Sequence, residues 1–237
     1  MISFLIDQYK ESKILRYVVF FFILLSIWWL YMYLSSITEG NGTDAFLLVY
    51  PILTIIGSVY GLMIGKKWGG FRSTFGSAVS IFALGLLAQT FGQYLYNYYQ
   101  VLQHIEIPYP SIGDAFYFAS VVLYIVGAFQ LARVAGINMT FSTLQGKLKA
   151  FVIPLAVLVV SYAVLLQGYE ADWSNKIIVF LDFGYPIGQA IYLSIALLAL
   201  LISKDILGGL MRKPIMLLIA ALLVQFIADF VFSYQVS

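Results

Sequence analysis

Two pairs of polar residues lie inside long apolar stretches of this chain, where groups that carry charge or form hydrogen bonds are rare. Gln89 and Gln93 form the first pair, and Gln225 and Asp229 form the second. Residues four apart lie on one face of a helix, so each pair presents two polar groups to the same side. An ionisable residue near the centre of a membrane span costs about 2.5–3.5 kcal/mol, and such residues normally face the interior of a helical bundle.

Three further polar residues extend this set. Asp182 and Gln189 lie in a later apolar segment, and Asp114 stands three residues after Ser111, which is the spacing of a capping box at a helix start. We expect the set to line an outward-facing cavity for a small ligand. For the glutamines taken singly, interhelical hydrogen bonding is the favoured interpretation, and for Asp114 it is helix capping, with cavity lining as the alternative in both cases. The candidate ligand-binding residues are Asp182, Asp229, Gln93, Gln225, Gln89, Gln189 and Asp114.

Two prolines in Tyr-Pro-Ile sequences are predicted to break helices. Pro186 removes the donor for the carbonyl of Asp182, and Pro51 does the same for Leu47. A broken helix in a membrane is tolerated only where protein or a polar cavity satisfies the freed groups. We therefore predict hinges at Pro186 and Pro51, with a simple kink that shapes the bundle as the alternative.

The composition identifies a membrane protein and excludes several chemistries. Of the 237 residues, 62% are hydrophobic and 10% are charged, and there is no cysteine and one histidine. A chain of this composition is a polytopic membrane protein. The sequence has no lysine deep in a span, no nucleotide-binding glycine loop, no nucleophile elbow and no cluster of metal ligands. We expect no enzymatic activity, no catalytic residues, no cofactor, no metal and no nucleic-acid partner.

Seven apolar segments are each long enough to cross a bilayer, at roughly 20 residues. The predicted fold is all-α, a polytopic membrane helical bundle with seven transmembrane helices that forms a single integral membrane domain over residues 1–237. The predicted helices cover residues 14–36, 45–65, 73–99, 111–135, 148–168, 177–203 and 214–235.

The distribution of charge predicts the orientation. Twelve of the 13 lysines and arginines fall on one side of these spans, and Lys176 alone falls on the other. By the positive-inside rule, the N-terminus of this multi-pass protein lies in the cytoplasm and the C-terminus lies outside the cell membrane. Tyrosines and tryptophans near the outer helix ends, Tyr96 among them, are predicted to form an interfacial belt.

An internal repeat relates the first three helices to the last three. The segments 86–98 and 222–234 are similar, Tyr50-Pro51-Ile52 corresponds to Tyr185-Pro186-Ile187, and both inner loops contain paired glycines beside basic residues. Because the fourth helix lies between the copies, both copies point the same way and form a parallel repeat. Chance similarity among apolar segments is the alternative.

Three motifs resemble a group of prokaryotic membrane modules. The segment 109–117 (YPSIGDAFY) resembles that group's P-S-x-x-D-x-F-Y entry, the segment 181–189 (LDFGYPIGQ) resembles its D-x-x-Y-P-x-G-D helix, and Ala228-Asp229 resembles its A-D pair. These modules are N-terminal multi-helix sensory regions placed before GGDEF diguanylate cyclase or histidine kinase domains. The resemblance implies a signal-sensing function, with Asp114, Asp182 and Asp229 as signal-site residues.

The chain departs from that group in two ways. Gln189 stands where the group more often has an acid, and the sequence shows neither an eighth helix nor an output domain. We expect either a shortened relative or a fragment of an eight-helix protein. The predicted function is a non-enzymatic sensory or receptor-like module that binds a small ligand and acts with a membrane or cytoplasmic signalling partner. A small-solute transporter with a 3+1+3 helix layout is the second hypothesis, and a structural subunit is the third.

Overall fold

The computed structural model is an all-helical bundle in the parts of the chain that it describes. These are residues 9–136, 173–206 and 212–236 with a few positions between 148 and 163, and the side chains of residues 202–212 and 229–236 are outside the description. The helices are α2 (Lys13–Leu34), α3 (Asn41–Val49), α4 (Ile52–Lys67), α5 (Thr74–Asn97), α6 (Ile112–Val134), α9 (Lys176–Ile206) and α10 (Arg212–Val236), with a short 3₁₀ turn η1 (Gly70–Arg72) and a π-helical turn η2 (Tyr98–Leu102).

The observed helices agree with six of the seven predicted spans to within a few residues. The predicted helix over 148–168 lies outside the described residues, so neither the count of seven nor the repeat is confirmed. Five described segments are long and apolar enough to cross a membrane, α3 with α4 counting as one of them, and α10 contains a shorter apolar helix over Lys213–Ala228. Length and composition therefore agree with an integral membrane protein.

The ends of several helices are fixed by local hydrogen bonds that the sequence dictates. Ser12 accepts from the N–H of Leu15 at 3.2 Å and begins α2, and Ser73 accepts from the N–H of Gly76 at 3.0 Å and begins α5. After α4, Gly69 adopts a φ of 93°, a left-handed conformation that stops the helix.

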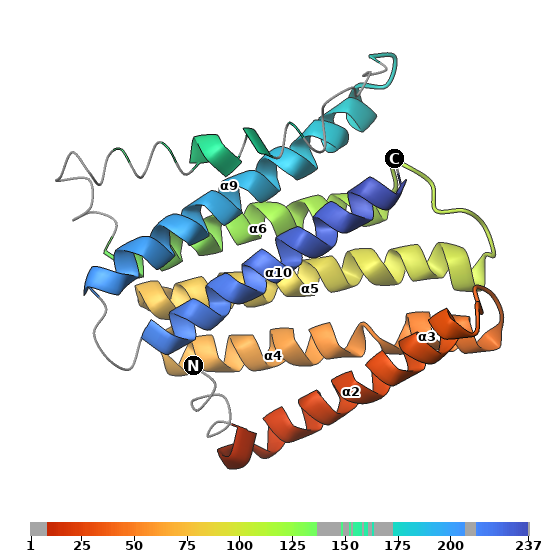
Figure 1. The fold of residues 1–237 in the computed structure, drawn as a ribbon, viewed down its shortest axis with the longest axis horizontal. Helices are drawn as coiled ribbons and strands as arrows, with labels where there is room; N and C mark the ends of the chain where they lie inside the picture. Colours follow the sequence, from red (N-terminus) through yellow and green to blue (C-terminus); the bar gives the residue numbers. More distant parts are fainter. Residues whose placement is uncertain are drawn as a thin grey trace.

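The helices lie side by side and α5 is at the centre (Figure 1). Helix α5 packs against α4 and α6. On the far side of α6 the order continues with α9 and then α10, whereas α2 packs mainly against α3 and α4. The buried core is formed by side chains of α5, α6, α9 and α10, among which Tyr192, Leu131 and Ile215 are fully buried. The span Thr74–Leu102 is 61% buried, whereas the α2 span is 11% buried, so α2 lies at the edge of the bundle with most of its surface available to lipid.

Glycines allow the close approach of α4 to α5. Gly57, Gly61 and Gly65 stand four apart on α4, and a Cβ at Gly61 would lie 2.8 Å from the Cβ of Ala83 on α5. Small residues at this spacing are typical of tightly packed membrane helices. The contact between these two helices therefore depends on the absence of side chains.

Between α5 and α6, glycines of each helix accommodate aromatic rings of the other. A Cβ at Gly92 of α5 would lie 2.6 Å from the ring of Tyr117, and a Cβ at Gly113 of α6 would lie 2.5 Å from the ring of Tyr96. These two rings stack with centroids 5.0 Å apart. The glycines thus place both tyrosines inside the interface, next to the candidate site.

The two prolines predicted to break helices behave differently. The helix is interrupted at Tyr50 and Pro51, between α3 and α4, as the sequence predicts. In contrast, α9 is continuous helix through Pro186, so the kink and hinge expected there stay predictions. Pro186 is buried, and Gly184 and Gly188 on either side lie directly against α6. Packing against α6 on both sides of the proline accounts for the continuous helix, because tertiary contacts can outweigh the loss of one hydrogen bond.

Candidate functional site: a tyrosine–carboxylate cluster

Asp114 lies buried at the start of α6 and accepts hydrogen bonds through both carboxylate oxygens. The backbone N–H of Ser111 donates to Oδ2 at 2.7 Å and the Ser111 hydroxyl donates to the same oxygen at 3.0 Å. The hydroxyl of Tyr96 donates to Oδ1. The predicted capping box is therefore confirmed, and the carboxylate lies where the partial positive charge of a helix N-terminus favours it.

Asp182 lies on α9, half-buried, and is held by a residue from the loop before α6. The hydroxyl of Tyr109 donates to Oδ1 of Asp182 at 2.5 Å. Burial, followed by the hydrogen bond to Asp182 and the charge of Asp182, raises the pKa of Tyr109 well above its ordinary value. The phenol thus remains protonated and continues to donate, which ties the loop to α9.

Tyr185 connects the two carboxylate positions. It stands one turn after Asp182 on α9, and its hydroxyl donates to the backbone carbonyl of Asp114 at 3.0 Å. The charge of Asp114 also acts on Tyr109, so both carboxylates lie near the same phenol. We name the resulting set, at one end of α5, α6 and α9, the tyrosine–carboxylate cluster; its members are Gln93, Tyr96, Tyr109, Asp114, Tyr117, Asp182 and Tyr185.

Gln93 joins this cluster to a break in the neighbouring helix. Its Oε1 accepts from the hydroxyl of Tyr117, and its Nε2 donates to Oδ1 of Asn97 at 2.9 Å. Asn97 is fully buried, and its Nδ2 donates to the carbonyl of Leu47. That carbonyl is the one deprived of its helical donor by Pro51, so a side chain from α5 satisfies the group that the proline frees.

Three more hydrogen bonds support the same break. The hydroxyl of Tyr94 donates to the carbonyl of Leu48 at 3.3 Å. Thr54 donates to the carbonyl of Pro51 at 2.7 Å and accepts from the hydroxyl of Thr90 at 2.6 Å. Polar side chains of α5 therefore line the broken helix, as membrane interiors require of irregular backbone.

The remaining predicted residues fall into three groups. Gln89 accepts from the hydroxyl of Tyr124 at 2.8 Å, one turn deeper in the α5–α6 interface, and acts as an interhelical link. Gln189 is buried in α9 and Gln225 is half-buried in α10. The side chain of Asp229 lies outside the described residues, so its predicted proximity to Asp182 stays a prediction.

Two hollows that the described part of the structure shows lie elsewhere. One is lined by α2 and Ile56 of α4, and the other is lined by Lys13, Arg16 and Tyr17 at the start of α2; no member of the cluster lines either. In the cluster, Tyr96 and Tyr109 donate to the two carboxylates, and the outward cavity expected there stays a prediction. Among the described residues, no group of three or more His, Cys, Asp or Glu side chains could hold a metal ion.

The roles of the tyrosines and Asn97 were not predicted from the sequence. Tyr96 was expected in an interfacial belt, but its side chain lies in the helix interface and donates to Asp114. A usable signal was present, since Gln93 and Tyr96 stand three apart on α5, as do Asp114 and Tyr117 on α6, and such residues share a helix face.

No protein-family model matches the chain, and no curated protein or solved structure matches it either. The class is therefore defined by the structure alone: a protein that is helical in its described parts, with several helices able to cross a membrane and a partly buried cluster of tyrosines and carboxylates at one end.

Proposed function

We propose that this protein is a non-enzymatic membrane sensory module that binds a small cationic ligand, such as an amine, at the tyrosine–carboxylate cluster. Two carboxylates and several phenol rings in one place are the groups that recognise an ammonium ion, by charge and by cation–π contact. Asp182 is the binding carboxylate, because it is only half-buried, whereas Asp114 is buried and three donors already hold it.

The observation that carries the proposal is the hydrogen bond from Tyr109 to Asp182. It joins the loop between α5 and α6 to α9 at the place where a ligand would arrive. A cation at Asp182 competes for that oxygen, releases Tyr109 and changes how the loop holds α9. Because α9 runs from this end of the bundle to the opposite end (Figure 1), a shift at its start reaches the other membrane surface. A membrane or cytoplasmic partner there would receive the signal.

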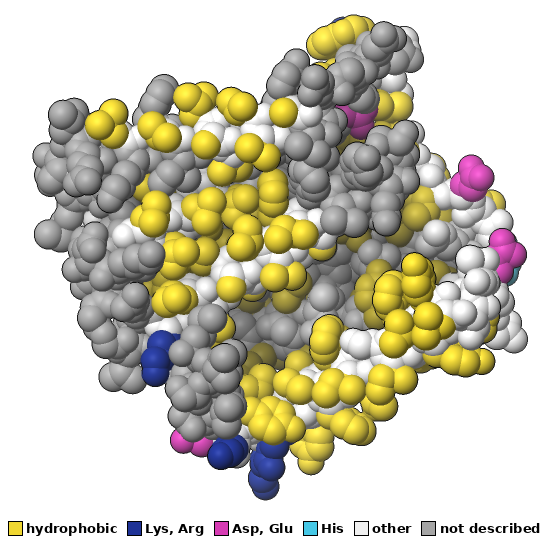
Figure 2. Space-filling view, in the orientation of Figure 1, with side chains coloured by type: hydrophobic (Ala, Val, Ile, Leu, Met, Phe, Trp, Pro, Cys, Tyr) yellow, Lys and Arg dark blue, Asp and Glu magenta, His cyan; other side chains and the backbone are white. Residues whose placement is uncertain are grey.

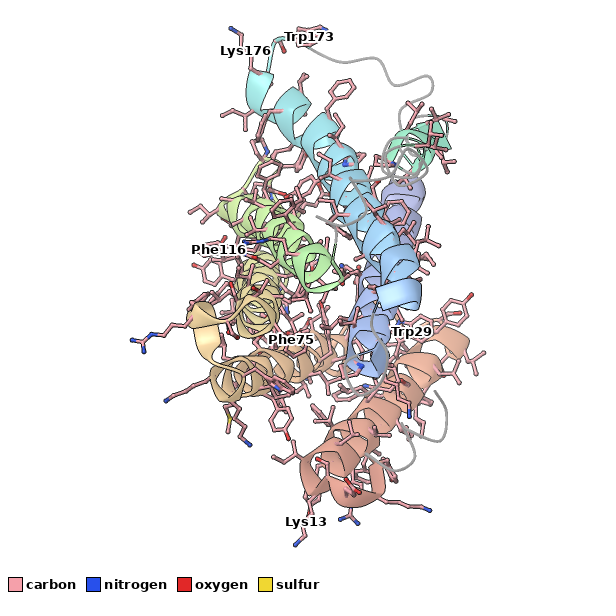
Figure 3. The ribbon with its side chains drawn as sticks, turned by 90° about the vertical axis from the view of Figure 1, so that its left-hand side faces the viewer. Lys13, Trp29, Phe75, Phe116, Trp173 and Lys176 are labelled. Carbon is pink, nitrogen blue, oxygen red and sulfur yellow. The ribbon has the colours of Figure 1, made fainter. Side chains whose placement is uncertain are left out.

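The proposed orientation places this cluster on the outer side. The described ends of α2 and α4 that carry Lys13, Lys66 and Lys67 lie at one end of the bundle, and the cluster lies at the other (Figure 1). Figure 2 shows most of the visible lysines and arginines at the lower left with an acidic group beside them, further acidic groups toward the right-hand edge, and hydrophobic side chains over much of the surface between. Figure 3 shows Lys176 and Trp173 together at the start of α9, away from Lys13. We infer a cytoplasmic N-terminus and an extracellular C-terminus from the positive-inside rule.

The direction of the helices supports the proposed parallel repeat. In Figure 1, α9 runs in the same direction as α4, and α10 runs in the same direction as α5. A repeat about an axis along the membrane normal requires this correspondence. Seven spans and the repeat remain part of the proposal.

Ligand-dependent thermal stability of the purified protein tests the sensory proposal. A panel of primary and quaternary amines is compared with neutral alcohols of the same shape. We expect stabilisation by at least one amine, and a loss of affinity of tenfold or more in Asp182→Asn, since a charge-assisted hydrogen bond contributes about 1.5–3 kcal/mol. Glu106→Gln, an exposed carboxylate in the same loop, is the matched control. Equal stabilisation by amines and alcohols would contradict the proposal.

A small-solute transporter is the second candidate. The observation in its favour is the interrupted helix at Pro51, because transporters often form their sites at discontinuous helices. Solute flux in liposomes separates the two candidates. Flux that is abolished by Asp229→Asn or Asp182→Asn would favour transport, and ligand stabilisation without flux would favour sensing.

A further inference from the structure

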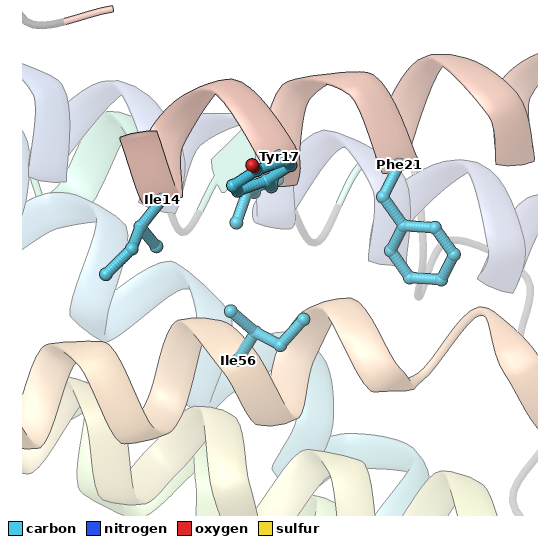
Figure 4. Close-up of a pocket in the computed structure, with 5 residues that line it drawn as sticks. Ile14, Tyr17, Phe21 and Ile56 are labelled. Carbon is cyan, nitrogen blue, oxygen red and sulfur yellow. The ribbon is translucent and has the colours of Figure 1, made fainter. Parts of the chain in front are cut away.

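An apolar groove lies between α2 and α4, on a part of the molecule that the proposed function does not use. It has a volume of about 320 Å³ and is lined by Ile14, Tyr17, Val18, Phe21 and Ile56. Figure 4 shows the side chains of α2 on one wall and Ile56 on the opposite wall. A groove of this lining, open on the lipid-facing side of a membrane protein, fits a hydrocarbon chain.

A basic hollow adjoins this groove at the start of α2. It has a volume of about 310 Å³ and is lined by Lys13, Arg16 and Tyr17, so Tyr17 belongs to both hollows. Lys13 and Arg16 stand three apart and share a helix face. Lys10 precedes them and is exposed, and Glu11 is the exposed acidic residue of the same segment. The described charge at this position is therefore positive overall.

Among the described residues, those that line this region are largely exposed. Ile14 is 46% exposed and Tyr17 is 72% exposed. Lys66 and Lys67, in the last turn of α4, lie at the same end of the bundle as the start of α2 (Figure 1). Basic pockets between membrane helices on one membrane side are typical sites for anionic lipid headgroups.

We propose that the α2–α4 groove binds one anionic phospholipid. Its phosphate lies against Lys13 and Arg16, and one acyl chain lies along Val18, Phe21 and Ile56. The adjoining basic and apolar hollows match the charged and apolar ends of such a lipid, whereas a zwitterionic lipid would lack the net charge and a free phosphate would leave the groove empty. The bound lipid would also cover a helix pair that shares few contacts within the bundle.

Native mass spectrometry of the full chain in detergent tests this site, with phosphatidylglycerol and phosphatidylcholine of identical acyl chains as probes. We expect at least tenfold tighter binding of phosphatidylglycerol. Each lysine or arginine near an anionic lipid surface contributes roughly fivefold to binding, so Lys13→Gln with Arg16→Gln together should weaken phosphatidylglycerol binding about 25-fold. Lys176→Gln, in the first turn of α9 at the opposite end of the bundle from the start of α2 (Figure 1), is the matched control and should leave binding unchanged.

A second variant tests the groove without altering charge. Val18→Trp fills the space between the helices, so it should weaken phosphatidylglycerol binding although both cations remain. Four results would overturn the proposal: equal binding of the two lipids, undiminished binding in the Lys13/Arg16 double variant, displacement of the lipid by inorganic phosphate, or a lipid-free dimer whose formation Val18→Trp abolishes.

Discussion

Asn97 offers a quantitative test of how the broken helix is stabilised. Its side chain is fully buried and makes two contacts, one to the carbonyl of Leu47 and one to the amide of Gln93. Asn97→Ala removes both and leaves the carbonyl of Leu47 and the amide of Gln93, each on a half-buried residue, without that partner. Interhelical hydrogen bonds in membranes average about 0.6 kcal/mol. An unsatisfied buried group costs about 1–3 kcal/mol. Because Pro51 already removes the helical donor for the carbonyl of Leu47, the cost of an unsatisfied group applies and not the smaller value of an interhelical hydrogen bond. We expect the free energy of unfolding to fall by about 2 kcal/mol.

The double-mutant cycle with Pro51→Ala identifies the cause of that loss. Alanine restores a backbone N–H at position 51, which can donate to the carbonyl of Leu47 as in an uninterrupted helix. Asn97→Ala should therefore cost about 1 kcal/mol less in the Pro51→Ala background than in the wild type. Independent sites would add within about 0.3–0.5 kcal/mol, so a coupling of this size is measurable.

The assay is reversible unfolding in mixed micelles, followed by circular dichroism, for the wild type, both single variants and the double variant. Gln100→Ala is the matched control, since Gln100 is an exposed amide just beyond the end of the same helix. The reasoning fails if Asn97→Ala costs the same free energy of unfolding with and without Pro51, or if Gln100→Ala is equally destabilising.

Three further predictions concern packing, titration and burial. Gly92→Ala should destabilise the protein by about 1–3 kcal/mol, because the added Cβ would lie 2.6 Å from the ring of Tyr117. Gly42→Ala in α3 is the control and should be neutral or stabilising, because nothing lies within 4 Å of a Cβ added there. Thermal unfolding compares the two variants. Tyr109→Phe should lower the free energy of unfolding by a constant amount below about pH 10, the ordinary pKa of tyrosine, and by less above it. The raised pKa means that the folded state holds this proton more tightly than the unfolded chain, so the stabilisation decreases once the unfolded tyrosine begins to ionise. Denaturation from pH 7 to 11 measures the difference. Thr43→Val should stabilise the protein, since the buried Thr43 hydroxyl has no hydrogen-bond partner among the described residues; a lower unfolding temperature would contradict this.

The sequence predicted the helices well because each is a long apolar segment with a readable end. The expected range 111–135 became α6 at Ile112–Val134, and the Ser111–Asp114 capping box was confirmed. The expected range 45–65 became α3 and α4, with the break at Pro51. These features depend on neighbours within one or two turns, so local composition is sufficient to predict them.

The partners of the polar residues could not be predicted in the same way. Gln93 and Asp114 were identified as buried polar groups, but their contacts to Tyr117 and Tyr96 depend on how closely α5 and α6 approach. That approach is set by glycines opposite the rings, and the sequence analysis did not pair them. Pro186 differs from Pro51, since α9 is continuous helix through it and both flanking glycines lie against α6.

By itself, the sequence determined that this is an all-helical chain with several helices able to cross a membrane, because apolar length and proline chemistry act locally. Only the tertiary structure decided that Tyr109 reaches Asp182, that Asn97 satisfies the carbonyl freed by Pro51, and that a basic hollow adjoins the apolar groove at α2. Each of these joins residues from different helices or a loop, and their distances follow from packing, which no spacing along the chain specifies.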